Sequence, residues 1–305
     1  MSAKYLGETF DIHAGGEDLV FPHHENEIAQ SEAASGKPLA KVWMHNGLVR
    51  IDNEKMSKSL GNFFTIRDVL RKVEPEALRY LLLGTHYRNP INFSDVALAD
   101  AERRVDSLYE TLAKVDDRLA GLAPEPGELL EQPLLEKTRR SFCEALGDDF
   151  NTAKALAALA DGFALMNVLC DPARVRGKDT TLVARTLFTL RADVARIGAV
   201  LGLLGEEPRA LLLRQRDSRA IMMGVDRVRV EGLLRLRDAA RKARDFAVAD
   251  SIRSELNAQG VEIRDTDKGT TWKMRVLSAS ARTHSEIAAA RSSRHFPLAA
   301  SHTHW

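Results

Sequence analysis

Apolar positions recur at helical intervals through the middle of the chain. From Ser94 onward, one stripe of apolar side chains lies three or four residues apart: Val105, Leu108, Leu112, Val115 and Leu119. This spacing predicts a long amphipathic helix that the Ser94 side chain can cap. Three more helices are predicted over roughly 134–147, 151–169 and 181–204, separated by polar or proline-bearing links. Four such stripes indicate an antiparallel helical bundle over residues 94–205.

Residues 1–93 show a different pattern, in which short strands alternate with loops and helices. Pro22 and Pro75 suit the first turn of a helix, and Gly36 and Gly84 suit the position just beyond a helix end. Thr65 has the spacing of a capping box with Asp68. The predicted elements are strand 10–13, helix 22–34, strand 48–51, a helix from about 66 and helix 75–84.

The C-terminal third changes pattern again. Residues 206–225 contain Pro208, Gly224 and clustered arginines, and we predict a linker there. Residues 226–259 predict two helices, and 261–264 with 270–273 alternate like a small hairpin, so 226–275 is predicted as a small module. Residues 276–305 lack apolar periodicity and are predicted to be disordered. The fold class is therefore α+β and mainly α.

Composition narrows the class of protein. The chain has 305 residues, enough for two or three domains, and its net charge of +1 means that any basic surface must be local. The two cysteines, Cys143 and Cys170, are expected to be small buried apolar residues in a reducing compartment. The most apolar run, 153–170, contains Asp161 and is short for a membrane span, and no signal peptide is recognised. We therefore expect a cytoplasmic protein.

A short cationic loop is the most informative segment. It reads Lys55-Met56-Ser57-Lys58-Ser59 and is followed by Leu60-Gly61. Two ammonium groups on flexible stems can follow a triphosphate whose charge moves during a reaction. Taken alone, a Lys/Ser-rich loop is more often a solvated turn.

The neighbouring motifs give this loop its meaning. The segments are Asp11–Leu19, Phe21–Glu27, Trp43–Gly47 and Glu76–Tyr80. In order and spacing, these motifs and the lysine loop resemble cysteinyl-tRNA synthetases, which are class I aminoacyl-tRNA synthetases. The resemblance runs to about Trp272. It implies that residues 1–93 are a remnant of a Rossmann-type catalytic domain with the Lys-Met-Ser-Lys-Ser loop, ahead of the helical bundle and a small anticodon-binding module.

The resemblance also implies roles for individual residues. It places Lys58 on the ATP phosphates with Lys55 as a second charge, and Gly16 and Asp18 at the adenosine end of ATP. His13 is expected near the bound cysteine. His23 and Glu27, four residues apart on one helix face, are implied as zinc ligands beside two cysteine thiolates.

Zinc has a physical purpose in such an enzyme. Shape and apolar contacts separate cysteine from serine by only about 1–3 kcal/mol. A substrate thiolate that binds zinc directly adds much more, because a hydroxyl is a poor soft ligand. The implied cofactor is therefore Zn²⁺, and ATP with Mg²⁺ is a substrate.

The chain departs from the family in the zinc and nucleotide motifs. The two zinc cysteines and the early His-x-Gly-His motif are missing, and Cys143 and Cys170 do not align with them. The chain therefore resembles the C-terminal portion of the enzyme, with half of the zinc site and half of the ATP site. We predict a cysteine–tRNA ligase fragment that is inactive alone. Two alternatives remain: the cysteine–amino-sugar ligase of mycothiol synthesis, and a non-catalytic tRNA-binding fragment.

A basic segment completes the partner prediction. Residues 209–244 contain eleven Lys/Arg and four Asp/Glu, which predicts salt-dependent phosphate binding. Trp272 could stack on a base or pack in the module. Expected partners are cysteine tRNA, L-cysteine and ATP, without a membrane, and we expect a monomer. The histidines of the tail, 284, 295, 302 and 304, are predicted to be disordered and not a metal site.

Overall fold

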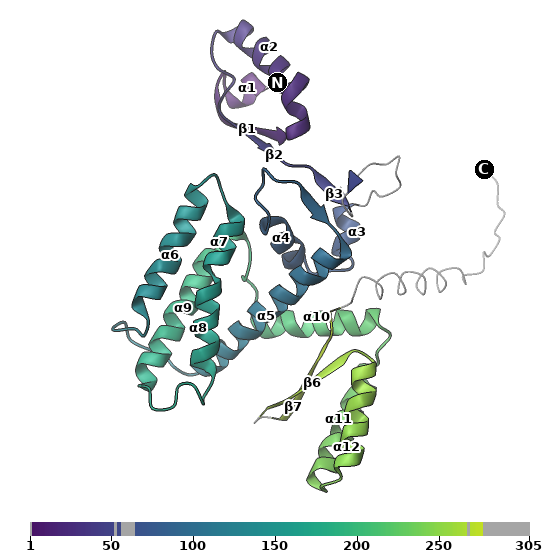
Figure 1. The fold of residues 1–305 in the computed structure, drawn as a ribbon. Coiled ribbons are helices and arrows are strands. Elements are labelled where there is room, and N and C mark those ends of the chain that lie inside the picture. Colours follow the sequence, from purple (N-terminus) through teal and green to yellow (C-terminus); the bar gives the residue numbers. More distant parts are fainter. Residues whose placement is uncertain (1, 52–53, 56–64, 267–268, 277–305) are drawn as a thin grey trace, which may run out of the picture. The chain divides into compact units, whose positions relative to one another are not determined.

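The chain forms two compact units, Met1–Gly205 and Glu206–Trp305 (Figure 1). A computed structural model describes residues 2–51, 54–55, 65–266 and 269–276. Each unit has its own buried cluster of apolar side chains.

The first unit opens with a parallel strand pair. Strands β1 (Phe10–Gly16) and β2 (Ala40–Asn46) pair in register, with Phe10 opposite Ala40 and Gly16 opposite Asn46. The connection between them is helical, as a parallel pair requires. The connection consists of η1 (Glu17–Leu19), η2 (Val20–His24) and α2 (Glu25–Ser35). A short helix, α1 (Ser2–Leu6), precedes β1. Gly36, at φ 68°, ends α2, which confirms that prediction.

A three-stranded sheet follows. Strand β3 (Val49–Ile51) lies between β4 (Glu54–Lys55) and β5 (Ile91–Phe93), antiparallel to the first and parallel to the second. The predicted strand at 48–51 is confirmed, whereas β2, β4 and β5 were not predicted.

Two short helices pack beside this sheet. Helix α3 (Ile66–Leu70) begins with a capping box: the Thr65 side chain accepts from the Asp68 backbone N–H, and the Asp68 carboxylate accepts from the Thr65 N–H. Helix α4 (Pro75–Leu83) has its proline in the first turn, as predicted. A small core joins these helices to the sheet and consists of Val69, Val73, Phe93 and Leu98.

The bundle forms the rest of the first unit. Its helices are α5 (Asp95–Leu119), α6 (Gln132–Gly147), α7 (Thr152–Ala158), α8 (Ala160–Cys170) and α9 (Thr180–Leu201), and α6 to α9 run side by side in Figure 1. The Ser94 hydroxyl accepts from the Ala97 N–H, which confirms the cap of α5. The single helix expected over 151–169 is instead two helices that meet at Leu159.

The apolar segment in this bundle has the length and composition of a membrane span. Within the described chain, Thr152–Cys170 is the one helical stretch that passes this test. Core helices of soluble proteins pass it too, and Phe163, Met166 and Leu169 are buried in the bundle. The segment is therefore weak evidence for a membrane.

The two cysteines differ in their surroundings. Cys170 is partly buried, and burial raises the pKa of its thiol to about 11. Cys143 is exposed, so the expectation that both cysteines are buried is wrong for Cys143. Its position on α6 lies between Phe142 and Ala145, which face the bundle core.

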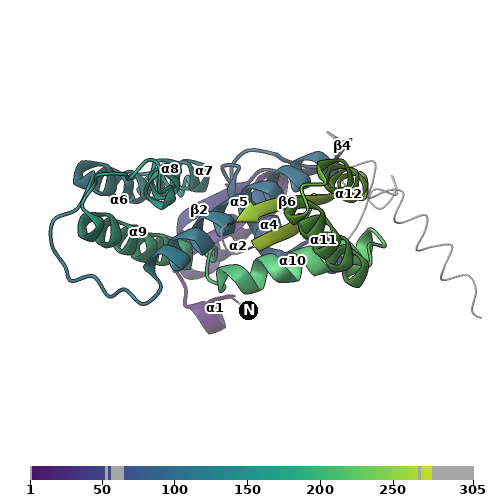
Figure 2. The ribbon, with the colours of Figure 1, turned by 90° about the horizontal axis from the view of Figure 1, so that it is seen from below.

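The second unit is a helical module with a hairpin. Its elements are α10 (Pro208–Met222), α11 (Arg227–Lys242), α12 (Phe246–Ala258), β6 (Val261–Thr266) and β7 (Gly269–Met274). The hairpin packs beside α11 and α12 (Figure 2), in antiparallel register with Ile263 opposite Trp272. Its core contains Val230, Leu256, Val261 and Met274.

Most of the predicted pattern of this unit is confirmed. Both helices in 226–259 and the hairpin are present. The segment expected to be a linker, 206–225, contains helix α10, because Pro208 stands in its first turn and the Glu207 side chain accepts from the next backbone N–H groups. The predicted tail disorder and its four histidines lie outside the described residues. The predicted fold class, α+β and mainly α with a helical bundle, is confirmed.

Candidate functional site

The candidate site lies at the carboxyl ends of β1 and β2. Because the two strands are parallel, the ends of both lie at one edge, and the register sets His13 opposite Trp43 and Gly15 opposite His45. Ligands of open parallel sheets bind outside this edge. Of three predicted residues, His13 lies in the middle of β1, Gly16 at its end and Asp18 just beyond it.

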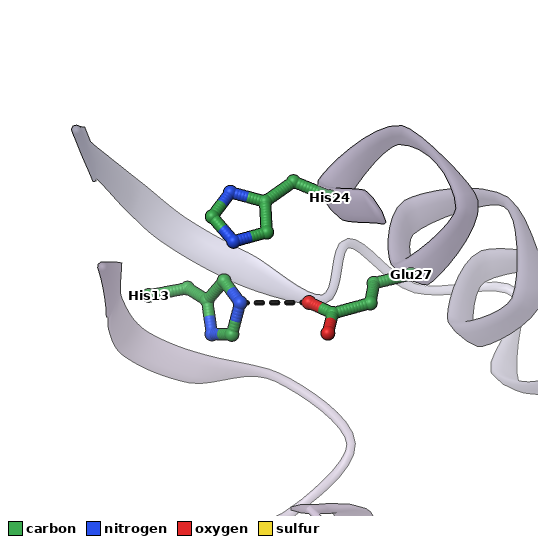
Figure 3. Close-up of side chains that lie close together, drawn as sticks. All are labelled: His13, His24 and Glu27. Carbon is green, nitrogen blue, oxygen red and sulfur yellow. Dashed lines mark ion pairs between the residues drawn. The ribbon is translucent and has the colours of Figure 1, made fainter. Parts of the chain in front are cut away.

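Three side chains of the types that ligate metals lie close together beside this edge (Figure 3). Ligand atoms of His13, His24 and Glu27 all lie within 4.8 Å of one another. The His13 Nε2 is 2.7 Å from the Glu27 Oε2. His13 comes from the strand, His24 from the end of η2 and Glu27 from the first turn of α2. Side chains from three elements, β1, η2 and α2, therefore converge on one point.

Aromatic rings enclose this cluster. The Trp43 ring lies 4.6 Å from the His13 ring and 5.2 Å from the His24 ring, between ring centroids. The His24 Nδ1 is 2.8 Å from the His45 Nε2, so one of these nitrogens donates and the other accepts. His24 is 5% exposed. Burial, and then the nearby His13, lower the pKa of His24, which favours the neutral imidazole that a metal needs.

Glycine at position 15 is required by this packing. A Cβ at Gly15 would lie 2.8 Å from the His24 Cε1 and 3.2 Å from the Leu19 Cδ1. The missing side chain therefore leaves the space that the His24 ring occupies.

The donor set fits zinc in part. Zinc takes imidazole nitrogen and carboxylate oxygen at about 2.0–2.2 Å, so neighbouring ligand atoms in a tetrahedral site lie roughly 3–4 Å apart. The three atoms of the cluster need only a small adjustment to meet that spacing. They supply three of four positions, and the open fourth position is the arrangement of sites that bind a substrate.

The structure brings some of the predicted site residues together. His13 and Glu27 are in contact, Gly16 is the last residue of β1, and Asp18 lies in η1 directly after it. Lys55 lies in β4, paired with Arg50 of β3, and Lys58 lies outside the described residues. The predicted ATP role of these lysines stays a prediction.

His23 occupies a different position from its neighbour. The helix expected from Pro22 is distorted, because Phe21 has φ −130° and ψ 133°, and regular helix begins at Glu25. His24 consequently turns inward toward Glu27, while His23 is exposed. The prediction that His23 binds zinc stays a prediction, and the approach of His24, like the ring of Trp43, was not foreseen from sequence. The adjacency of two histidines is the signal that could have indicated it.

The basic segment of the second unit is largely engaged in ion pairs. Arg237 donates two hydrogen bonds of 2.9 Å to the Asp265 carboxylate, and Arg241 donates a third at 2.7 Å. The Arg216 guanidinium lies 4.6 Å from the Trp272 ring centroid, and Trp272 packs against the core of this unit. Of the two roles left open for Trp272, the structure therefore shows packing.

Comparison with known proteins identifies the class. Residues 1–103 match the model of the class I (C) tRNA synthetase catalytic domain, residues 141–205 match the DALR domain, and residues 228–272 match the cysteinyl-tRNA ligase anticodon binding domain. The fold and the three matches, in this order, define a class I aminoacyl-tRNA synthetase.

Curated relatives narrow the class to one family. The cysteine–tRNA ligase of Geobacter metallireducens is 48% identical over 278 residues, and that of Anaeromyxobacter dehalogenans is 50% identical over 279. Each alignment covers 90% of this chain and 56% of the relative. The chain belongs to the cysteinyl-tRNA synthetase family, and it spans about half the length of the curated relatives it matches.

Among solved structures, a methionyl-tRNA synthetase of Mycobacterium tuberculosis in complex with methionyl-adenylate is similar in backbone to this chain. It has a TM-score of 0.49 and 22% sequence identity, and it covers 72% of this chain and 45% of that chain. Likeness at this level carries no functional argument.

Proposed function

We propose that this chain carries part of an ATP-dependent cysteine–tRNA ligase. The observation that carries the proposal is the 48% identity to cysteine–tRNA ligases over 90% of the chain. It is supported by the cluster of His13, His24 and Glu27 at the carboxyl edge of β1 and β2. In such a ligase the cysteine carboxylate attacks the α-phosphate of ATP and pyrophosphate leaves. A terminal ribose hydroxyl of the tRNA then takes the aminoacyl group and releases AMP.

We assign the residues of this chain as follows in that reaction. Gly16 and Asp18, at the end of β1, hold the adenosine part of ATP, and the ammonium groups of Lys55 and Lys58 hold the phosphates, with Mg²⁺. His13 lies beside the bound cysteine. Glu27 and a histidine of the 23–24 pair would hold part of a zinc site, and the metal would supply a soft ligand position that a cysteine thiolate fills far better than a serine hydroxyl.

The isolated chain is not expected to form the adenylate. Among the described residues, the parallel sheet that carries the candidate site has two strands, β1 and β2. Ile12 and Val42 of these strands are 52% and 51% exposed, although parallel sheets are normally covered on both faces. A site so open to water does not position ATP and cysteine for in-line attack.

Pyrophosphate exchange tests this expectation. The chain is incubated with ATP, L-cysteine and labelled pyrophosphate, beside the Lys58→Ala variant. We expect equal background exchange in both samples. Cysteine-dependent exchange above that of the variant would contradict it.

A non-catalytic tRNA-binding role is the second candidate. It is favoured by the folded second unit and its match to an anticodon binding domain over residues 228–272. The same match speaks against an amino-sugar ligase, because that reaction has no anticodon to read. Binding of cysteine tRNA and of unrelated tRNAs to the chain tests it. Preference for cysteine tRNA, weakening with salt, is expected, and equal binding to all tRNAs would reject anticodon reading.

A further inference from the structure

We propose that Arg235, Lys242 and Arg244 of the second unit form a phosphate-binding stripe that holds the tRNA backbone. The inference rests on the proposed tRNA-ligase function and names the residues that make its electrostatic contact. It follows from which cations of the basic segment already have partners in the protein.

Most Lys and Arg side chains of the basic segment 209–244 form ion pairs with carboxylates of the protein. Three exposed arginines form ion pairs with N–O distances of 2.8–2.9 Å. The pairs are Arg214 with Glu206, Arg227 with Glu231 and Arg229 with Glu255. Arg237 and Arg241 share Asp265. In contrast, within the described residues, Arg235, Lys242 and Arg244 have no ion pair or side-chain hydrogen bond, and all three are exposed. The charge that remains for a partner is therefore concentrated in these three.

Two of the three cations share one side of α11, and the third follows two residues beyond the end of the helix. Arg235 and Lys242 are seven residues apart on α11, so they lie about 20° apart around the helix and roughly 10 Å apart along it. The buried face of α11 carries Val230, Leu234 and Arg237 and points the other way. Arg244, at φ 62°, follows just beyond the helix end. A stripe of this length meets several charges of a nucleic-acid strand, which carries one about every 3.4 Å.

The acids that border the stripe are already engaged. Glu231 accepts from Arg227, and Asp238 lies 3.8 Å from the Arg237 guanidinium and accepts from the Thr270 hydroxyl at 2.9 Å. Asp238 and exposed Ala239 lie between Arg235 and Lys242 on this side of the helix, and both side chains are shorter than those of the two cations. The stripe therefore presents net positive charge on a smooth helix surface, which suits a regular polyanion.

A structural role for the same residues gives a different expectation. Cations near a helix C-terminus interact favourably with its dipole, by about 0.3–1 kcal/mol each. That role would change the stability of α11 when Lys242 or Arg244 is replaced. It would leave the salt dependence of RNA binding unchanged.

The test compares two triple variants of the full 305-residue chain. The stripe variant is Arg235→Ala, Lys242→Ala, Arg244→Ala, and the matched control is Arg214→Ala, Arg227→Ala, Arg229→Ala, which removes the same charge from paired cations of the same unit. Filter binding of a cysteine tRNA transcript is measured over a range of KCl concentrations. Circular dichroism checks the fold, and Arg235→Gln with Lys242→Gln serves as a milder second variant.

We expect the stripe variant to lose about 2 units of the slope of log K against log salt, at roughly 0.7 per lost contact. Its binding at 0.1 M salt should weaken at least about tenfold, while the control changes little. An unrelated tRNA should weaken by the same factor, because phosphate contacts carry no sequence information. An unchanged slope in the stripe variant, or an equal loss in the control, would overturn the proposal.

Two further outcomes separate the proposals. If the unaltered chain binds no tRNA, both the tRNA-ligase function and the stripe are overturned. If the unaltered chain binds tRNA and the stripe variant binds it equally well, only the stripe is overturned. The stripe variant is also tested on phosphatidylserine vesicles. If it loses binding to the vesicles but binds tRNA as well as the unaltered chain does, the stripe is a lipid-binding surface and the proposal of an RNA site is overturned.

Discussion

Tyr109 and Glu76 form a buried hydrogen bond between two helices of the first unit. The Tyr109 hydroxyl donates to the Glu76 Oε1 at 2.8 Å, and the backbone N–H of Leu204 donates to the Oε2 of the same carboxylate at 3.0 Å. Tyr109 is 0% and Glu76 is 8% exposed. One carboxylate therefore joins α4, α5 and the chain just after α9, and a buried carboxylate is stable only when such donors satisfy it.

The first prediction removes one of these donors. Tyr109→Phe should lower the free energy of unfolding by about 1–3 kcal/mol, because the buried Glu76 carboxylate loses a partner while the ring keeps its packing. Urea unfolding followed by circular dichroism measures it. Tyr5→Phe is the matched control, since Tyr5 is 73% exposed, and it should change stability by less than about 0.5 kcal/mol. A change in Tyr109→Phe no larger than that would contradict the prediction.

Local signals in the sequence predicted the elements that depend on them. The capping box of Thr65, the cap at Ser94 and the glycine end at Gly36 each rest on neighbouring residues, and the structure contains all three. The contact of Tyr109 with Glu76 could not be predicted, because the partners are 33 residues apart and neither pattern nor propensity encodes the approach. Strand β2 was missed for a similar reason: it is defined by its pairing with β1, and its sequence does not alternate between apolar and polar residues.

The site shows the same division between local and distant information. The resemblance indicated His13, Gly16, Asp18 and Glu27, and the structure sets them at one edge of β1 and β2. The choice between His23 and His24 depends on the distorted turn at Phe21, which a regular helical period does not anticipate. The resemblance therefore indicated two members of the cluster, His13 and Glu27, whereas the approach of His24 came only from the geometry.

The second prediction concerns the space that Gly15 leaves. Gly15→Ala should displace the His24 ring, because the new Cβ would lie 2.8 Å from its Cε1, and should lower stability by about 1–3 kcal/mol. Imidazole NMR signals of His24 and urea unfolding report the two effects. Gly147→Ala is the control, since no atom lies within 4 Å of a Cβ there. Unshifted His24 signals in Gly15→Ala would show that the packing is wrong.

The third prediction concerns zinc. Glu27→Gln should lower the affinity of the chain for Zn²⁺ at least about tenfold, because an amide oxygen is a weaker ligand than a carboxylate. Competition with a chromogenic chelator measures the affinity. Glu32→Gln, an exposed change on the same helix, should leave it unaltered.

Two parallel variants then identify the histidine ligand. His23→Gln tests the ligand that the resemblance implies, and His24→Gln tests the residue whose nitrogen lies near His13 and Glu27. The variant with the larger loss of Zn²⁺ affinity names the ligand. Equal affinity in Glu27→Gln and the unaltered chain would reject zinc binding at this cluster.

The last prediction concerns the pH dependence of the second unit. Hydrogen bonds from Arg237, then one from Thr270 and the charge of Arg241, hold the pKa of Asp265 below its ordinary value. A carboxyl whose pKa is lower in the folded state stabilises fully above its unfolded pKa, about 3.9, and this contribution is lost as the pH falls below it. The stability of the unit should therefore decrease between about pH 5 and pH 2.

Asp265→Asn should remove this contribution and flatten that acid dependence. At pH 7 it should lower the free energy of unfolding by about 1–3 kcal/mol, because the Arg237 side chain is 7% exposed and loses two charged hydrogen bonds, while partial exposure of Asp265 limits the effect. Trp272 emission, in a Trp43→Phe, Trp305→Phe background, reports unfolding of the hairpin. Glu231→Gln, which breaks the exposed pair with Arg227, should change stability by less than about 0.5 kcal/mol. If Asp265→Asn keeps the acid dependence of the unaltered chain, another carboxyl controls it, and the Arg237–Asp265 pair does not anchor the hairpin.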